Sequence, residues 1–306
     1  PFTSPRLLAD IGGTYARFTL ETAAGVFQHS ASLRCAEHAD FHAAVSSFLA
    51  GLAQRLGPAW RAPRAGAFAV ATAVGGDRIA FTNSGWDFSR ADTQRALGLD
   101  TLLILNDFEA LALSLPRLTA AQLRAWTGAA AAPPPRATLA VIGPGTGLGV
   151  AGLLPTAHGW AAVPGEGGHA TLSAADDFDA ALLAAVRREH PHVSAERLLS
   201  GIGLPVLHRG VAAVLGAPFP ALAAEQIVEH GLAGSDVVCS RTLDAFCALL
   251  GSFAGNVALV LGARGGVYIG GGIVPRLGER FFQSAFRQRF EDKLSLIHIS
   301  EPTRPY

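Results

Sequence analysis

The sequence predicts an α/β protein of two domains. Its 306 residues exceed what one hydrophobic core usually holds. In the first third, apolar runs of strand length alternate with a helix-periodic segment, which is the pattern of an α/β fold. Each half also opens with a strand, a glycine turn and a second strand, which favours two related domains. We expect a small α/β domain over 1–117, a large α/β domain over 118–293, and room for a ligand cleft between them.

The elements of the first half follow from periodicity and turn residues. Strands at 7–11 and 16–22 flank a glycine turn as a hairpin. The other predicted elements are a helix at 40–56, a buried strand at 65–74, a strand at 101–107 and a helix-like patch at 118–128. The linker AAAAPPPR follows, and its consecutive prolines cannot continue a helix.

The second half repeats the strand, glycine turn and strand at 138–154, and a helix is predicted at 176–190. The segment 245–263 is uncharged and long enough to cross a membrane. Its Gly251 and Gly255 favour a buried, closely packed helix instead, and we expect no membrane partner.

The composition excludes several classes of protein. Only 16% of the residues are charged and 24 basic groups balance 24 acidic ones, so no nucleic-acid partner is expected. The cysteines Cys35, Cys239 and Cys247 form no CxxC pair, which supports neither a zinc knuckle nor a disulfide framework and fits a reduced cytoplasm. Because Lys293 is the only lysine, neither a Walker A loop nor a pyridoxal-type Schiff base is expected.

The turn GPGTGLG at 143–149 is a candidate phosphate-binding hairpin. Its glycines stand at alternate positions, so it does not have the GxGxxG spacing of dinucleotide-binding folds. Glycines around Thr146, between two strands, allow backbone N–H groups and a hydroxyl to converge on phosphate oxygens. An ordinary tight hairpin is the alternative.

Asp10 lies two residues before a second glycine turn, which is formed by Gly12, Gly13 and Thr14. A third glycine cluster at 270–272 follows the strand GVYI, and three such loops suit a nucleotide clamped between two domains. A carboxylate beside phosphate-binding amides repels phosphate unless a cation, usually magnesium, lies between them. An aspartate bonded to its own backbone in the turn is the alternative.

The apolar strand LLILN ends in Asn106, and Asp107 follows it. In open α/β sheets, polar side chains at the carboxyl ends of strands face the ligand crevice. Asp107 is the candidate general base, because a carboxylate there can accept a hydroxyl proton during phosphoryl transfer, and Asn106 can bond neighbouring hydroxyls. A helix N-cap explains either residue as well.

A glycine-rich loop and the start of a helix carry further polar candidates. Glu166 and His169 lie on PGEGGHATLS, which is too rich in glycine and proline for a helix, and they could bond adjacent hydroxyls of a polyol. A metal pair is a weak alternative, and a plain surface loop is a serious one. Glu196 follows Ser194, the predicted cap of a helix, and spacing alone favours stabilisation of the helix dipole by Glu196.

Taken in order, these motifs resemble the bacterial ATP-dependent glucokinase family, a non-ROK branch of the hexokinase and actin-like ATPase superfamily. The resemblance runs from about Leu7 to Lys293 and rests on DIGGTYAR, TNSGW, LNDFEA, GPGTGLGV, PGEGGH, HVSAERLLSG and GGVYIGGGIVPR. It implies a two-domain actin-like ATPase fold, related to ribonuclease H, with the active site in the interdomain cleft.

The resemblance also implies a function: transfer of the γ-phosphoryl group of ATP to the 6-hydroxyl of glucose, in the cytoplasm, at the entry to glycolysis. Asp107 would be the base, and the groups gripping other sugar hydroxyls would be Asn106, Glu166, His169 and Glu196. Asp10 would act through the magnesium shell of MgATP. The other nucleotide-binding residues would be Gly12, Gly13, Thr14, Gly145, Thr146 and Gly147 at the phosphates, and Gly271 and Gly272 at the adenosine.

The chain departs from this family in two places, and it also lacks a motif of the related ROK branch. Tyr15 replaces a frequent asparagine, which puts a phosphate contact by that side chain in question. The cysteine-rich zinc motif of ROK sugar kinases is absent. Residues 294–306, LSLIHISEPTRPY, resemble a translated sequencing adapter, so we expect a non-native tail in place of the family's closing segment, which leaves the activity of this chain open.

Other functions stay open at this point. A non-catalytic sugar-binding regulator on the same fold usually carries an added DNA-binding helical module, for which the sequence has no room before its first strand. A kinase for another hexose, or an acetate- or glycerol-type kinase, is a further alternative, although EGGH and the Asn106–Asp107 pair match the hexose branch better. The donor could be ATP, ADP or polyphosphate, and a homodimer is one candidate assembly.

Overall fold

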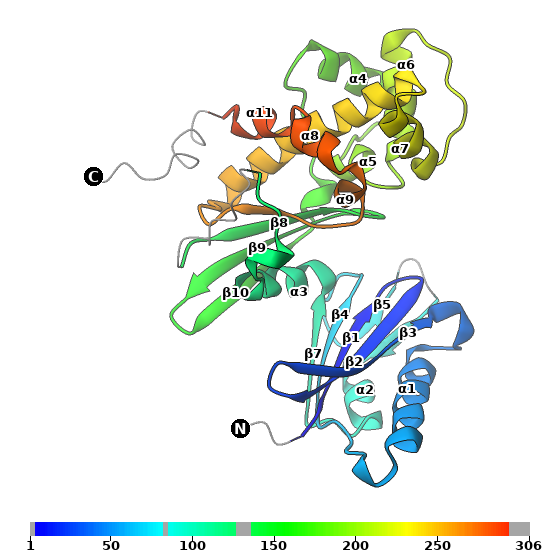
Figure 1. Ribbon diagram of the computed structural model, residues 1–306, viewed down its shortest axis with the longest axis vertical. Helices are drawn as coiled ribbons and strands as arrows, with labels where there is room; N and C mark the ends of the chain where they lie inside the picture. Colours follow the sequence, from blue (N-terminus) through cyan, green and yellow to red (C-terminus); the bar gives the residue numbers. More distant parts are fainter. Residues whose placement is uncertain (1–3, 82–84, 127–135, 294–306) are drawn as a thin grey trace. The chain divides into compact units, whose positions relative to one another are not determined.

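The computed structural model describes residues 4–81, 85–126 and 136–293. It divides into two compact units, unit 1 up to Ala110 and unit 2 from Leu111 (Figure 1). The division falls inside helix α3 (Asp107–Ser114), which follows the last strand of unit 1. A boundary between folding domains after Arg117 stays a prediction.

Unit 1 is built on a five-stranded sheet in the order β3-β2-β1-β4-β7. Its strands are β1 (Arg6–Ile11), β2 (Tyr15–Ala23), β3 (Val26–Arg34), β4 (Ala65–Val70) and β7 (Thr101–Asn106). A separate two-stranded sheet pairs β5 (Arg78–Ala80) with β6 (Asp87–Ser89). The helices are α1 (Phe41–Leu56) and α2 (Arg90–Ala96), which lie beside the sheet in Figure 1. The expected hairpin and the strands after it are confirmed.

The core of unit 1 lies on one face of this sheet. Alternate residues of β1 are buried, as a half-covered strand requires. Phe18 of β2, Phe41 of α1 and Phe68 of β4 are at most 1% exposed. Their rings pack together, with 5.5 Å between the centroids of Phe41 and Phe68. Asp40 begins α1 by accepting a hydrogen bond from Ala43 N at 2.7 Å.

Unit 2 is built on a four-stranded sheet in the order β10-β9-β8-β11. Its strands are β8 (Leu139–Pro144), β9 (Leu148–Thr156), β10 (Gly159–Gly165) and β11 (Val267–Ile269). Its helices are α4 (Asp177–Arg187), α5 (Ala195–Leu198), α6 (Leu204–Leu215), α7 (Ala224–Ala233), α8 (Val237–Leu261), α9 (Ile273–Leu277), α10 (Glu279–Gln283) and α11 (Phe286–Glu291). Every residue of β8 is buried, because helix α8 packs against that strand.

Helix α8 is the central element of unit 2. It is long and apolar enough to cross a membrane, yet 72% of its most apolar window is buried inside the unit. A side chain at Gly251 would come within 2.3 Å of Phe286 O, and one at Gly255 within 2.8 Å of Phe290 O. The two glycines therefore let α11 lie directly on α8, which confirms the expectation of a closely packed helix.

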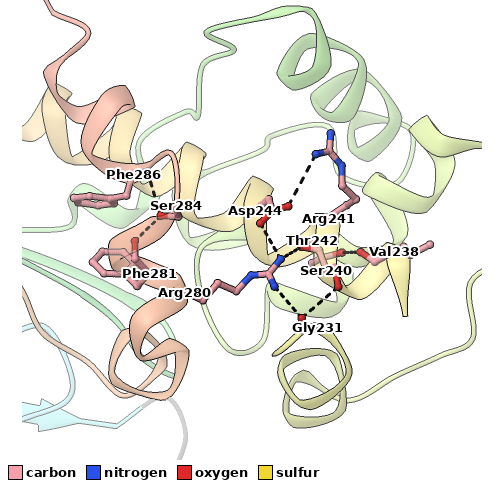
Figure 2. A network of polar contacts seen from close by, with 10 residues as sticks. All are labelled: Gly231, Val238, Ser240, Arg241, Thr242, Asp244, Arg280, Phe281, Ser284 and Phe286. Carbon is pink, nitrogen blue, oxygen red and sulfur yellow. Dashed lines mark hydrogen bonds and ion pairs between the residues drawn. The ribbon is translucent and has the colours of Figure 1, made fainter. Parts of the chain in front are cut away.

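Arg280 of α10 joins three helices of unit 2 (Figure 2). Its guanidinium donates to Gly231 O of α7 at 3.0 Å, and to Ser240 O and Asp244 Oδ1 of α8 at 2.9 and 2.8 Å. Gly231 is itself packed closely on α8, since an added Cβ would meet Leu243 at 2.6 Å. The planar fork of arginine serves these separate acceptors at once.

The helix-like patch expected at 118–128 is wrong within its described part. Only a short 3-10 turn forms there, Ala120–Gln122, with Thr119 N donating to Gln122 Oε1 at 2.9 Å. Trp126 instead stacks on Phe286 at 5.4 Å between ring centroids. Packing of this large ring outweighs the weak local preference for helix. The linker residues up to 135 and residues 82–84 of TNSGW lie outside the described residues.

Candidate active site

The carboxyl ends of three parallel strands meet at one edge of the unit 1 sheet. In the strand register Ile11 of β1 lies beside Val70 of β4, and Val70 lies beside Asn106 of β7. Asp10 and Asp107 are therefore carried to the same edge by strands that are far apart in the sequence. This is the arrangement expected for a ligand-binding edge of an α/β sheet.

Asn106 and Asp107 begin helix α3 and share one backbone donor. Phe108 N donates to Asn106 Oδ1 and to Asp107 Oδ1, both at 2.9 Å. Asn106 Nδ2 donates to Thr72 O at 3.2 Å, which fixes the orientation of the amide. The bonds from Phe108 N match the helix-capping interpretation, and each side chain has further bonding capacity. The ligand-facing position of the two residues stays a prediction.

The pKa of Asp107 is raised above the ordinary aspartate value. Burial of the carboxyl group is the main cause, and the negative charge of Asp10 raises it further, while the hydrogen bond from Phe108 N acts in the opposite direction. A carboxylate whose proton affinity is raised in this way is a better proton acceptor than an exposed one.

The turn at Gly12–Thr14 is closed by a hydrogen bond within its own backbone and is also contacted by Cys35. Gly12 N donates to Tyr15 O at 2.9 Å, and Cys35 N donates to Thr14 O at 2.9 Å. The buried thiol of Cys35 lies 3.4 Å from Gly12 O. Within the described chain, the amides of Gly13 and Thr14 make no hydrogen bond. Two adjacent free amides at a turn can bind an anion.

Asp10 forms an ion pair that the sequence argument did not include. Arg17 Nη1 lies 2.8 Å from Asp10 Oδ2, with both side chains more than half exposed. The two residues face each other across the β1–β2 register. A shallow hollow on this face of the sheet is lined by Asp10 and Arg17 and by the hydrogen-bonded hydroxyls of Thr19 and Ser30.

Unit 2 contains the second glycine turn, at Gly145–Gly147. Gly145 N donates to Gly147 O at 2.8 Å, and Gly201 N donates to Gly145 O at 2.8 Å, which ties the turn to the segment after α5. No described residue accepts a hydrogen bond from the amides of Thr146 and Gly147. This turn therefore offers the same pair of free donors as the turn in unit 1.

Glu196 supports this turn directly. Its Oε2 accepts a hydrogen bond from Leu148 N at 2.8 Å. Ser194 caps α5 by accepting from Arg197 N at 3.2 Å, so the helix start does not depend on Glu196 for its cap. The interpretation of Glu196 as a dipole-stabilising residue is incomplete, because the structure adds a contact to a strand 48 residues away.

Glu166 and His169 lie on a short turn that packs against the start of β9. A side chain at Gly168 would meet Leu148 O at 2.1 Å, so only glycine allows this approach. Ala195 N donates to Ala170 O at 2.9 Å, which brings the turn next to the helix of Glu196. Both side chains are exposed, with 3.9 Å between Glu166 Oε2 and His169 Nε2. Exposed polar groups on a fixed backbone are free to bind hydroxyls.

Gly271 lies against Pro144, the residue before the Gly145–Gly147 turn. Its φ is +76°, and an added Cβ would come within 2.3 Å of Pro144 O, so a side chain is excluded on both grounds. Gly270 N donates to Ile142 O at 2.8 Å, which holds the glycine cluster beside β8. Gly272 follows at the start of α9.

The predicted residues thus form one group in each unit. Unit 1 brings together Asp10, the Gly12–Thr14 turn, Asn106 and Asp107, and unit 2 brings together the Gly145–Gly147 turn, Glu166, His169, Glu196, Gly271 and Gly272. Sequence reasoning missed Arg17 and Cys35. The hairpin register predicts the first, because Asp10 and Arg17 flank the turn symmetrically. Cys35 gave no signal, since its contact to Gly12 spans 23 residues.

Comparisons with known proteins give the family. The glucokinase family model matches residues 7–302. A glucokinase of Chromobacterium violaceum is 50% identical over 293 residues, covering 96% of this chain and 82% of that protein. A glucokinase of Aromatoleum aromaticum is 47% identical, covering 95% of this chain and 86% of that protein.

Solved structures agree. The crystal structure of a glucokinase from an Antarctic psychrotroph is similar with a TM-score of 0.87 and 38% identity, covering 97% of this chain and 91% of that chain. A ROK hexokinase from Thermus thermophilus has a TM-score of 0.67 at 17% identity, covering 94% and 88% of the two chains, and shares the fold. The expected α/β fold of the actin-like ATPases is confirmed, and the chain belongs to the glucokinase family.

Proposed function

We propose that this protein is a glucokinase, which transfers the γ-phosphoryl group of ATP to the 6-hydroxyl of glucose and yields glucose 6-phosphate at the entry to glycolysis. Family membership over nearly the whole chain supports the activity. The position of Asp107 supports the chemistry, because a half-buried carboxylate with a raised pKa stands at the carboxyl edge of a parallel sheet.

Asp107 is the proposed general base. Its carboxylate accepts the proton of the 6-hydroxyl as the bond from that oxygen to the γ-phosphorus forms and the bond to the β–γ bridging oxygen breaks. Asn106, whose amide is fixed by Thr72 O, has a second N–H for a neighbouring sugar hydroxyl. We expect Asn106 and Asp107 to accelerate phosphoryl transfer by positioning the sugar and by accepting the proton of its 6-hydroxyl.

The two glycine turns are the proposed phosphate sites. Free amides at Gly13 and Thr14, and at Thr146 and Gly147, would donate to phosphate oxygens and so bind negative charge without a lysine. Asp10 would hold magnesium, which enters as part of the MgATP substrate, through water. The exposed carboxylate of Asp10 fits this role, with Arg17 as its counter-ion when the nucleotide is absent.

The remaining groups are proposed to bind glucose and adenosine. Glu166, His169 and Glu196 stand around the start of β9 and offer charged or imidazole partners for sugar hydroxyls. A glucokinase of Balamuthia mandrillaris was solved in complex with glucose, and it shares the fold of this chain at 20% identity and a TM-score of 0.74. Gly271 and Gly272 border the proposed adenosine position, where a side chain at Gly271 is excluded.

The test is a coupled assay for glucose 6-phosphate on Asp107→Asn, with Asp100→Asn as the matched control. Asp100 precedes the opposite end of β7 and is paired with Arg64. We expect kcat of Asp107→Asn to fall by about 10²- to 10⁴-fold with glucose affinity retained, because asparagine cannot take the proton. An unchanged kcat in Asp107→Asn would refute the base assignment.

The same assay separates the alternatives. Phosphorylation of mannose or fructose in preference to glucose would point to a kinase for another hexose, and ADP or polyphosphate as the better donor would replace ATP. Glucose binding without turnover would favour a sugar-binding regulator. A cytoplasmic location is part of the proposal, supported by Cys35, Cys239 and Cys247 being free thiols. A homodimer stays a prediction for light scattering to check.

A further inference from the structure

Three donor groups of different chemistry meet in unit 2, where α6 passes the start of α8. They are an imidazole nitrogen of His208, a carboxylate oxygen of Asp236 and the sulfur of Cys239, and all three atoms lie within 4.8 Å of one another. None of these residues belongs to the groups proposed to bind ATP or glucose. Nitrogen, oxygen and sulfur donors at this spacing are the ligand types of a zinc site.

The first support for a bound ion comes from His208 of α6. The residue is 1% exposed, and its Nε2 is buried with no hydrogen bond to any described residue. Buried polar side-chain atoms nearly always have a partner, and one left without is costly. A neutral imidazole has a lone pair that a metal ion can bind.

Asp236 and Cys239 are held in place by the helix they begin. Asp236 is the N-cap of α8, and its Oδ1 accepts from Cys239 N at 2.7 Å. Its carboxylate also interacts with the thiol of Cys239, whose proton a bound metal ion would displace. Cys239 is a free, fully buried thiol one turn into the helix. A substrate could not reach a sulfur and an imidazole that are both buried, so a nucleophilic Cys–His pair does not fit.

We propose that His208, Asp236 and Cys239 form a structural site for one zinc ion that joins α6 to the first turn of α8. A thiolate and a carboxylate neutralise the two charges of the ion, which suits a buried position. Zinc bonds of about 2.0 to 2.3 Å place tetrahedral ligand atoms about 3.3 to 3.8 Å apart, so the groups need to close by about 1 Å. Water can complete the site beside the partly exposed Asp236.

The site would replace the proton on the thiol of Cys239. Zinc would convert it to a thiolate and bind an imidazole nitrogen of His208 in the same step. The ion would then tie the core helix α8 to α6, which otherwise meet through apolar packing.

The test uses the untagged full chain, stripped of metal and titrated with cobalt as a spectroscopic substitute for zinc. We expect one cobalt per chain, a sulfur-to-cobalt charge-transfer band in the near ultraviolet, and loss of that band on adding zinc. Cys239→Ser should abolish the band and weaken zinc binding by more than about 100-fold, since even outer-shell partners account for 10- to 100-fold. Cys247→Ser, which alters the other buried thiol of α8, should keep both.

Two further results test the zinc site, and the wild-type measurements among them do not depend on the folding of any variant. Zinc should raise the midpoint of thermal unfolding of the wild-type chain and of Cys247→Ser, and leave that of His208→Gln unchanged. Absence of the charge-transfer band in the wild-type chain overturns the proposal. So does a band that Cys247→Ser or Cys35→Ser removes, because the thiolate ligand would then be another cysteine.

Discussion

The two glycine turns, Gly12–Thr14 in unit 1 and Gly145–Gly147 in unit 2, have the same backbone design. Each joins antiparallel strands, closes with one internal hydrogen bond, and leaves two adjacent amides free. They differ in how a carboxylate is used. Asp10 is exposed near the first turn and forms an ion pair with Arg17. Glu196 instead accepts a hydrogen bond from the backbone of β9, the strand that follows the second turn.

This difference gives the two proposed phosphate sites different electrostatic surroundings. An exposed carboxylate repels phosphate unless a cation intervenes, so the first turn is suited to a metal-bound phosphate. The second turn has its carboxylate engaged and is held by Gly201 and Gly271 on either side, so it is fixed in shape before any ligand arrives. We expect substitutions near the first turn to act mainly through the electrostatics of the site. Substitutions near the second turn should act mainly by destabilising the fold around it.

The largest structural effect should come from Gly271→Ala. Alanine at φ +76°, with its Cβ 2.3 Å from Pro144 O, should cost more than about 2 kcal/mol of unfolding free energy and raise KM for ATP. Denaturant unfolding and initial rates measure both. Gly145→Ala is the control for stability, because an added Cβ there meets no atom within 4 Å. A similar loss of unfolding free energy in both variants would contradict the steric argument.

Glu196→Ala should have the next largest effect. Leu148 is 5% exposed, so its N–H would lose its acceptor in a buried position, at a cost of about 1 to 3 kcal/mol. Glu196→Gln keeps an acceptor and should lose less stability. An equal loss of stability in both variants, measured in urea, would instead assign the effect to the charge of Glu196 at the start of the helix.

Asp10→Asn should move the pH profile of catalysis. The negative charge of Asp10 raises the pKa of Asp107, so its removal lowers that pKa, and the acid limb of kcat should shift to lower pH even though the rate itself falls. In the wild type, the raised pKa means that the folded state holds this proton more tightly than the unfolded chain. Stability therefore falls as pH rises from the ordinary aspartate value through the raised one. If the acid limb of kcat stays at the same pH in Asp10→Asn, the electrostatic coupling between Asp10 and Asp107 is contradicted.

Arg17→Leu should have the smallest effect on stability, below about 1 kcal/mol, because both members of the ion pair are more than half exposed. It should lower the magnesium concentration that gives half-maximal rate, since Asp10 loses its competing partner. Arg64→Leu removes a comparably exposed pair with Asp100 and should leave the magnesium requirement unchanged. An equal shift in both would trace the effect to net charge.

Local sequence was enough to place the two turns and the strand-end residues. The strands beside Asp10 and Asp107 are long apolar runs, and parallel strands bring their carboxyl ends to one edge whatever packs on them. Long-range contacts could not be read in this way. The bond from Leu148 N to Glu196 joins residues that only the folded unit brings together, and Trp126 turned a helix-like pattern into a 3-10 turn by packing on Phe286.

The shared donor at the start of α3 has a consequence for the catalytic cycle. Phe108 N is bonded to Asn106 Oδ1 and to Asp107 Oδ1 at the same distance of 2.9 Å. When Asp107 takes up a proton its oxygen becomes a weaker acceptor, and Asn106 keeps the amide satisfied. Asp107, as the proposed base, can therefore gain and lose a proton without loosening the start of the helix that positions it.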